Sequence, residues 1–129
     1  MKIYHTGDWH IGKVFLHKSF IDDQREVLGK FLEKVEAEMP ELVIIAGDIY
    51  DKSIPTVEAV GLLNETLSKL VMEHRRKVVI ISGNHDSADR LSFGSEMLED
   101  NGLHIVTDIV KSLSPIELED EHGKLNVYA

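Results

Sequence analysis

Short apolar runs alternate along this chain with longer amphipathic segments. Four runs have the length and composition of buried strands, at residues 3–6, 42–46, 78–82 and 103–106. The intervening segments 18–38 and 55–77 carry apolar side chains at helical spacing. Strands that alternate with helices predict a mainly parallel sheet with right-handed crossovers, so the expected fold class is α/β.

The two long helices each have a predicted buried face. In the first helix, which is expected to end before Pro40, this face comprises Phe20, Val27, Leu28, Phe31, Leu32 and Val35. The second helix is expected to begin near Pro55, and its face comprises Val60, Leu63, Leu67, Leu70 and Val71. A short third helix is predicted over residues 96–101, and a hairpin is predicted between 115–118 and 125–128.

The composition is that of one globular domain. The chain has 129 residues, of which 43% are hydrophobic and 29% are charged. No apolar run approaches the roughly 18–20 residues that span a bilayer, and the start lacks a signal peptide, so we expect a cytoplasmic protein without a membrane. The chain stops at Ala129 inside an apolar run, which predicts a domain truncated on its C-terminal side.

Charge restricts how the protein could bind nucleic acid. The formal net charge is −9, whereas affinity for DNA comes largely from neutralising phosphates with basic side chains. Bound divalent ions would reverse the local field. We therefore expect weak unaided affinity for DNA, with a basic partner or another domain supplying most of the contacts.

Three of the predicted strands are each followed by a glycine and then by polar residues. The segments are Gly7-Asp8-Trp9-His10, Gly47-Asp48-Ile49-Tyr50-Asp51 and Gly83-Asn84-His85-Asp86. Because the carboxyl ends of parallel strands meet at one edge of a sheet, these loops are expected to form a single site. Asp8, His10, Asp48 and Asn84 are the candidate metal ligands. Oxygen and imidazole donors without thiolate suit manganese, iron or zinc, and manganese best where carboxylate and amide dominate.

His85 and Asp51 are the candidate catalytic residues. Two ions roughly 3.5–4 Å apart can clamp the attacking and leaving oxygens of a phosphoester. A protonated His85 could stabilise charge on the phosphate or give a proton to the leaving oxygen. Asp51 is placed to hold the other ring nitrogen of His85.

Each of these residues also has a structural interpretation. Asp8, Asp48 and Asn84 follow glycine and could be ordinary turn residues. His85 could be a structural loop histidine, and Asp51 a surface carboxylate. Asp86 is interpreted as a residue that braces the loop and is left outside the site.

Taken together, the three motifs resemble those of calcineurin-like metallophosphoesterases. The opening residues 1–12 and the segment 83–87 are more narrowly similar to the SbcD-type nuclease subunits. The resemblance covers essentially the whole chain, and it implies that residues 1–129 form the N-terminal part of a metallophosphoesterase (nuclease) domain with an α/β/β/α sandwich.

The same resemblance implies a set of residue roles. Asp8 and His10 would hold one ion, Asp48 would bridge two ions, and Asn84 would hold the second. His85 would be the catalytic histidine, oriented by Asp51. The two ions would be Mn²⁺, and a hydroxide bridging them would attack the phosphodiester.

The implied activity is that of an exonuclease on duplex ends and an endonuclease on single strands and hairpins. It would act in DNA repair with an SbcC-like ATPase subunit, and the full-length protein is expected to be a homodimer. The family's Gly-His-x-His motif is not among these residues, so the second metal position lacks part of its ligand set and the activity of this chain alone is left open. The alternatives are a phosphatase of the same superfamily and a non-catalytic scaffold or inactive fragment.

Overall fold

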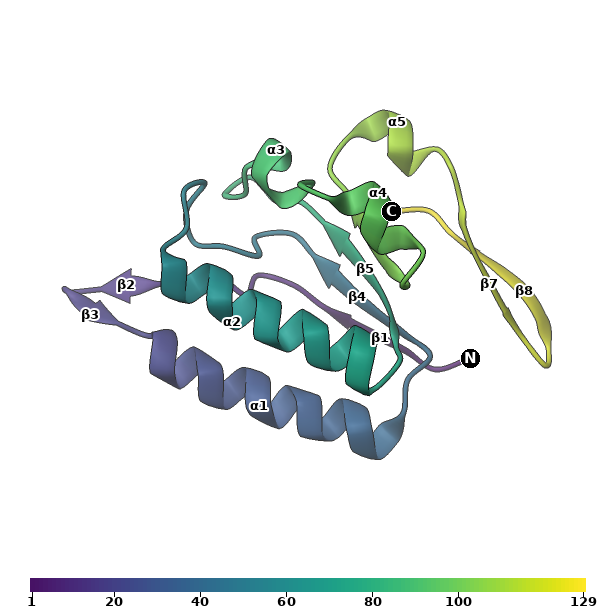
Figure 1. Ribbon diagram of the computed structural model, residues 1–129, viewed down its shortest axis with the longest axis horizontal. Coiled ribbons are helices and arrows are strands. Elements are labelled where there is room, and N and C mark those ends of the chain that lie inside the picture. The colour runs from purple at the N-terminus through teal and green to yellow at the C-terminus, as the bar shows by residue number, and fades with distance from the viewer.

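A four-stranded parallel sheet forms the centre of the computed structural model, which describes residues 1–129 (Figure 1). The strand order is β1-β4-β5-β6, with bounds Ile3–Thr6, Leu42–Ala46, Lys77–Ile81 and Leu103–Val106. Every neighbouring pair is parallel. The predicted α/β class, the parallel sheet and the strand at 103–106 are therefore confirmed.

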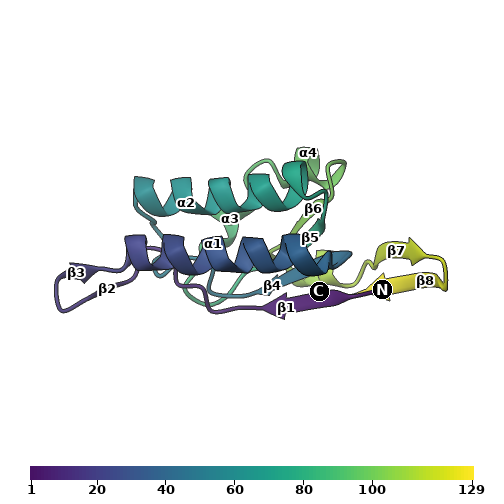
Figure 2. The ribbon, with the colours of Figure 1, turned by 90° about the horizontal axis from the view of Figure 1, so that it is seen from below.

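Helix α1 (Ile21–Glu38) and helix α2 (Val57–Ser68) lie side by side on one face of the sheet (Figures 1 and 2). The alternation of side chains along each strand explains the packing. On β4 and β5, the residues facing the helices are buried without exception: Val43, Ile45, Val78 and Ile80. The helices close this core with Leu28, Leu32 and Val35 from α1 and Leu62 and Leu63 from α2.

Helix α1 begins three residues later than predicted because a small hairpin precedes it. Strands β2 (Val14–Phe15) and β3 (Lys18–Ser19) pair through a turn in which Leu16 and His17 have φ of 47° and 62°. Val27, predicted to be buried, is 63% exposed. It lies about 100° around the helix from Leu28, away from the line of contact with the sheet.

Helix α2 begins at a Thr56 N-cap, whose side chain accepts a 3.2 Å hydrogen bond from the backbone N–H of Ala59. The helix continues as a π-helical turn, η1 (Lys69–Glu73), and its predicted last residue, Lys77, instead begins β5. Val60, predicted to be buried, is 45% exposed. None of the helices combines the length and the apolar character that crossing a membrane requires.

The C-terminal part adds three short helices and a hairpin. The helices are α3 (Ala88–Leu91), α4 (Ser95–Glu99) and α5 (Ile109–Ser112), and the hairpin pairs β7 (Ile116–Asp120) with β8 (Gly123–Val127). Leu118 of the hairpin packs on Leu42 and Val79, which face away from the helices. The N-terminal amino group forms a 2.8 Å ion pair with Asp120. The hairpin therefore contacts the opposite face of the sheet from α1 and α2.

Candidate metal centre

Three loops meet at the carboxyl edge of the sheet because β1, β4 and β5 are neighbours. Their backbones are bonded to one another: the N–H of Asp8 donates to the carbonyl of Gly47 at 3.0 Å, and that of His10 donates to the carbonyl of Asp48 at 2.9 Å. The N–H of Gly47 in turn donates to the carbonyl of Ile81 at 2.9 Å. The loops that carry the candidate residues are therefore linked by backbone hydrogen bonds.

Gly83 permits a close contact between the loop after β5 and Asp48 in the loop after β4. A Cβ atom at this position would overlap both the backbone nitrogen and the carboxylate of Asp48. Gly7 is similar, since a Cβ there would overlap the carbonyl oxygen of Ala46. Gly7 and Gly83 are thus required by the close packing of one loop on its neighbour.

Asp8, His10 and Asp48 bring their side chains together. Nε2 of His10 lies 3.8 Å from Oδ1 of Asp8 and 3.7 Å from Oδ2 of Asp48. These separations are too long for hydrogen bonds. Two metal–ligand bonds of about 2.0–2.2 Å can span atoms up to about 4 Å apart, which covers both separations from His10. All three donor atoms lie within 4.8 Å of one another. The donor set therefore fits a divalent cation.

The backbone at these three residues is unusual. Asp8, His10 and Asp48 have φ of 53°, 45° and 47°, in the left-handed region that residues other than glycine seldom adopt. Such conformations persist where surrounding contacts hold the backbone in place, and they are common at functional sites. Here the interloop hydrogen bonds hold the backbone in place.

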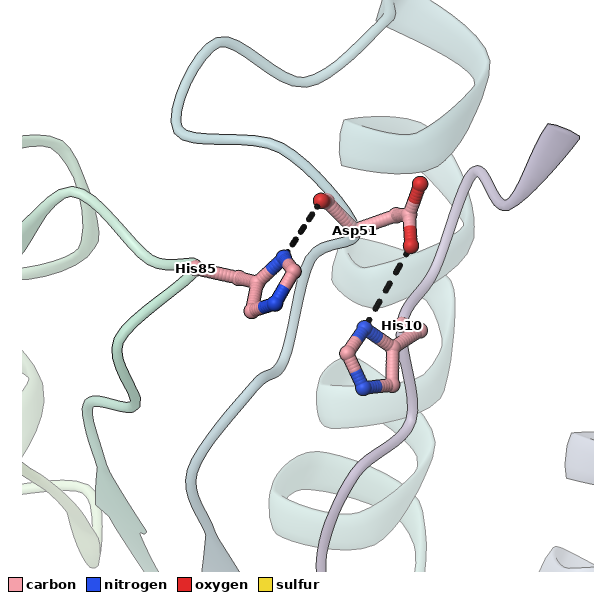
Figure 3. A group of neighbouring side chains, drawn as sticks. All are labelled: His10, Asp51 and His85. Carbon is pink, nitrogen blue, oxygen red and sulfur yellow. Dashed lines mark hydrogen bonds and ion pairs between the residues drawn. The ribbon is translucent and has the colours of Figure 1, made fainter.

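The carboxylate of Asp51 contacts His10 rather than His85 (Figure 3). Its Oδ1 lies 3.4 Å from Nδ1 of His10 and 2.9 Å from Nζ of Lys13. Nδ1 of His10 is buried and has no hydrogen bond of good geometry, and the Asp51 carboxylate lies beside it. The expected contact of Asp51 with the ring of His85 is made by its main-chain carbonyl, whereas its carboxylate turns toward the first loop.

The ring of His85 is held by a main-chain group. Its Nδ1 lies 3.0 Å from the carbonyl oxygen of Asp51 (Figure 3), and because a carbonyl can only accept, Nδ1 carries the proton. Nε2 is thereby left free to exchange a proton with a ligand. The ring packs edge-on against His10, with centroids 5.0 Å apart, and the residue is exposed. The site can therefore present an imidazole to a substrate from solvent.

Asn84, the fourth predicted ligand, is exposed. It lines a cavity of about 480 Å³ together with Asp51 and His85. Its assignment to a second ion stays a prediction.

Asp86 braces the site as the sequence indicated. Its Oδ2 accepts hydrogen bonds from the N–H groups of Gly83 at 2.8 Å and Ile49 at 3.1 Å. Its Oδ1 accepts one from the N–H of Tyr50 at 2.9 Å. One carboxylate thus ties the loop after β5 to the loop after β4. Burial raises the pKa of the Tyr50 phenol to about 12, and the negative charge of Asp86 adds to this shift.

Two residues at the site were not predicted. Lys13 pairs with Asp51, as described above. Gln24, on the first turn of α1, bonds to the backbone of residues 9–12. A sequence signal for Gln24 exists, since it is a polar residue between Phe20 and Leu28 on the apolar stripe of the helix.

Comparisons with known proteins identify similar sequences. The family model of the calcineurin-like phosphoesterases matches residues 1–127. The chain is also 47% identical over 118 residues to the SbcD component of the nuclease SbcCD from Staphylococcus epidermidis. That alignment covers 92% of this chain and 32% of the relative, so the chain spans about a third of the length of the curated protein it matches.

Proposed function

This chain belongs to the calcineurin-like phosphoesterase family, and we propose that it is part of a metal-dependent nuclease of the SbcD type that hydrolyses DNA phosphodiester bonds. The observation that carries the proposal is the meeting of Asp8, His10 and Asp48 at one edge of the sheet. Their donor atoms fit a divalent cation, and the similar Staphylococcus epidermidis protein is named as a component of a nuclease.

In this proposal the ligands divide between two ions. Asp8 and His10 hold the first, Asp48 contributes to both, and Asn84 contributes to the second. When bound, the ions supply an activated water and neutralise charge on the phosphate. Carboxylate, amide and imidazole donors without thiolate favour Mn²⁺. The acidic side chains also need such ions, because uncompensated carboxylates would repel a phosphodiester.

His85 acts on the substrate. With Nδ1 bonded to the carbonyl of Asp51, its Nε2 can hold a proton toward the leaving oxygen or toward a non-bridging phosphate oxygen. General acid assistance of this kind contributes about 10²–10⁴ in rate. Asp51 acts through His10 instead: its carboxylate, 3.4 Å from Nδ1, keeps Nε2 facing Asp8 and Asp48, as carboxylates do beside ligating histidines.

The proposed setting is a DNA repair complex in the cytoplasm with an SbcC-like ATPase subunit. The net charge of −9 supports a need for such a partner, because an overall negative charge opposes the binding of duplex DNA. Co-purification with the ATPase subunit tests this assignment. Homodimerisation stays a prediction, and light scattering on the intact protein checks it.

Substrate preference separates a nuclease from a phosphatase. With Mn²⁺, the intact protein is expected to cleave duplex ends, hairpins and the bis-ester of p-nitrophenyl phosphate faster than p-nitrophenyl phosphate itself. A protein that turns over only the mono-ester is a phosphatase, and this result would contradict the proposal.

Two variants test the catalytic role of His85 and the metal-binding role of Asp48 separately. His85→Leu is expected to bind Mn²⁺ with wild-type affinity and to cleave about 10²–10⁴-fold more slowly. Asp48→Ala is expected to lose Mn²⁺ itself, as measured by calorimetry. A His85→Leu protein with wild-type turnover would dismiss the role given to this histidine.

A further inference from the structure

Gln24 forms hydrogen bonds with three residues of the loop that carries His10. Its Nε2 donates to the carbonyl oxygen of His10 at 2.8 Å and to that of Trp9 at 3.1 Å. Its Oε1 accepts from the N–H of Gly12 at 2.9 Å. Two carbonyls demand donors and one N–H demands an acceptor, so the orientation of the amide is determined by its partners. Gln24 therefore makes three of the four hydrogen bonds available to a glutamine with this one loop.

The position of Gln24 on α1 makes this use of a polar side chain unusual. It lies one turn after Phe20 and one turn before the buried Leu28, on the face that packs on the sheet. An apolar residue at this position would extend the core, whereas a half-buried amide loses water and recovers that cost only if it is hydrogen-bonded. The polar atoms of Gln24 thus bond to the loop.

The loop needs an external restraint because its own backbone is strained. His10 has φ of 45°, a conformation that costs a residue with a Cβ atom of order 1–2 kcal/mol. The loop backbone is bonded on one side to the loop after β4, through the N–H of His10 and the carbonyl of Asp48 at 2.9 Å. Gln24 bonds the other side, through the His10 carbonyl. His10 is therefore held between α1 and the loop after β4.

We propose that Gln24 is a positioning residue for the metal centre, which fixes the His10 main chain so that Nε2 of the ring faces Asp8 and Asp48. This inference rests on the proposed function, since it assigns Gln24 a role in cation binding. Partners that orient ligands are worth about 10–100-fold in metal affinity in other sites. Because Gln24 acts on the backbone, the loss expected on its removal lies near the lower end, at about tenfold.

Two isosteric variants and one control test the inference in the intact protein. Gln24→Met keeps the volume of the side chain and removes all three hydrogen bonds. Gln24→Glu keeps the acceptor for the Gly12 N–H but turns a carboxylate oxygen toward the carbonyls of Trp9 and His10. Glu33→Gln changes an exposed residue on the same helix and serves as the control.

The first measurement is hydrogen exchange at the Gly12 amide, followed by NMR without metal. We expect faster exchange at Gly12 in Gln24→Met than in wild type, with no change at the amide of Ile45 in the core. The second is the dissociation constant for Mn²⁺, determined by calorimetry below the melting temperature of each variant. We expect it to rise about tenfold in Gln24→Met and at least as much in Gln24→Glu, and to stay unchanged in Glu33→Gln.

The outcomes separate this inference from the proposed function. A wild-type protein that binds no Mn²⁺ overturns the metal centre itself, and the role of Gln24 falls with it. A wild-type protein that binds Mn²⁺, with Gln24→Met binding it equally well, overturns the role of Gln24 alone. A lower melting temperature with unchanged Mn²⁺ affinity also overturns it, because that result describes a purely structural side chain.

Discussion

The backbone N–H of His85 donates a 3.0 Å hydrogen bond to Oδ1 of Asp48. The other carboxylate oxygen of Asp48, Oδ2, faces Nε2 of His10 at 3.7 Å. A single side chain from the loop after β4 therefore joins the loop after β1 to the loop after β5. This arrangement lets structural and ligating roles be separated by substitution.

Asp48→Asn is expected to keep the fold and lose the cation. The amide oxygen can still accept the N–H of His85, but the negative charge beside Asp8 is removed. We expect the melting temperature without metal to be equal to or above that of wild type. Added Mn²⁺ at about 100 times its dissociation constant should stabilise the wild-type protein by about 2.7 kcal/mol and the variant hardly at all. Thermal melts with and without Mn²⁺ measure this, and equal stabilisation of both proteins would exclude Asp48 as a ligand.

Asp51→Ala is expected to act on His10 and to spare His85. The substitution removes the carboxylate beside Nδ1 of His10 but keeps the main-chain carbonyl that His85 contacts. Affinity for Mn²⁺ should fall about tenfold or more. The ¹⁵N chemical shifts of the His85 ring, which report its tautomer, should stay as in wild type. A changed His85 tautomer with unchanged affinity for Mn²⁺ would instead show that the Asp51 side chain orients His85.

Asp86→Ala is expected to destabilise the protein strongly. The substitution leaves the N–H groups of Gly83, Ile49 and Tyr50 without an acceptor. At about 1 kcal/mol for each lost hydrogen bond to a partly buried donor, the free energy of unfolding should fall by about 2–4 kcal/mol. Asp86→Asn retains one acceptor oxygen and should lose less. Urea denaturation of both variants measures the difference, and the exposed Asp89→Asn provides a control.

Gly83→Ala and Gly29→Ala are expected to have opposite effects. A methyl group at Gly83 would overlap Asp48, so this variant should lose both stability and Mn²⁺ affinity. At Gly29, inside α1, an added Cβ meets nothing within 4 Å. Alanine there should stabilise the protein by about 0.5–1 kcal/mol through higher helix propensity. Thermal denaturation of the pair checks both signs, and a tolerated Gly83→Ala would contradict the packing of the two loops.

Stability is expected to fall at alkaline pH partly through Tyr50. Burial raises its pKa in the folded protein from 10.0 to about 12. Between these values the unfolded chain has released the phenolic proton and the folded chain has kept it. The free energy of unfolding therefore decreases as the pH rises through this window.

Tyr50→Phe should show a shallower decrease of stability between these pH values than wild type. Some decrease should remain, because burial also raises the pKa of Tyr4 to about 12. The exposed Tyr128→Phe should behave as wild type does. Denaturant titrations along a pH series measure the slopes, and identical slopes for Tyr50→Phe and wild type would rule out this contribution.

The sequence allowed the sheet to be predicted because its strands are continuous apolar runs set between amphipathic helices. The hairpin β2–β3 escaped prediction since its strands have two residues each and its left-handed turn residues, Leu16 and His17, are not glycine. The helices α3 and α5 have four residues each, less than two turns of a periodic pattern.

Within the site, the sequence predicted which loops meet but not how each side chain turns. The convergence of the loops follows from parallel strands, as the positions of Asp8, His10 and Asp48 illustrate. The direction of Asp51 depends on the left-handed backbone at Asp48, which no spacing rule contains. The contacts of Gln24 depend on the angle at which α1 crosses the loop, and this angle is a property of the packed core.

At Asp8, the residue that would best stabilise the left-handed backbone differs from the residue that the proposed metal site needs. Its side chain is 79% exposed, so a residue there contributes little to the core, and glycine would adopt a φ of 53° more readily than alanine by about 1 kcal/mol. Selection for heat resistance alone would therefore favour glycine at this position. Stability therefore does not explain the aspartate at position 8, whereas the proposed cation binding gives it a role.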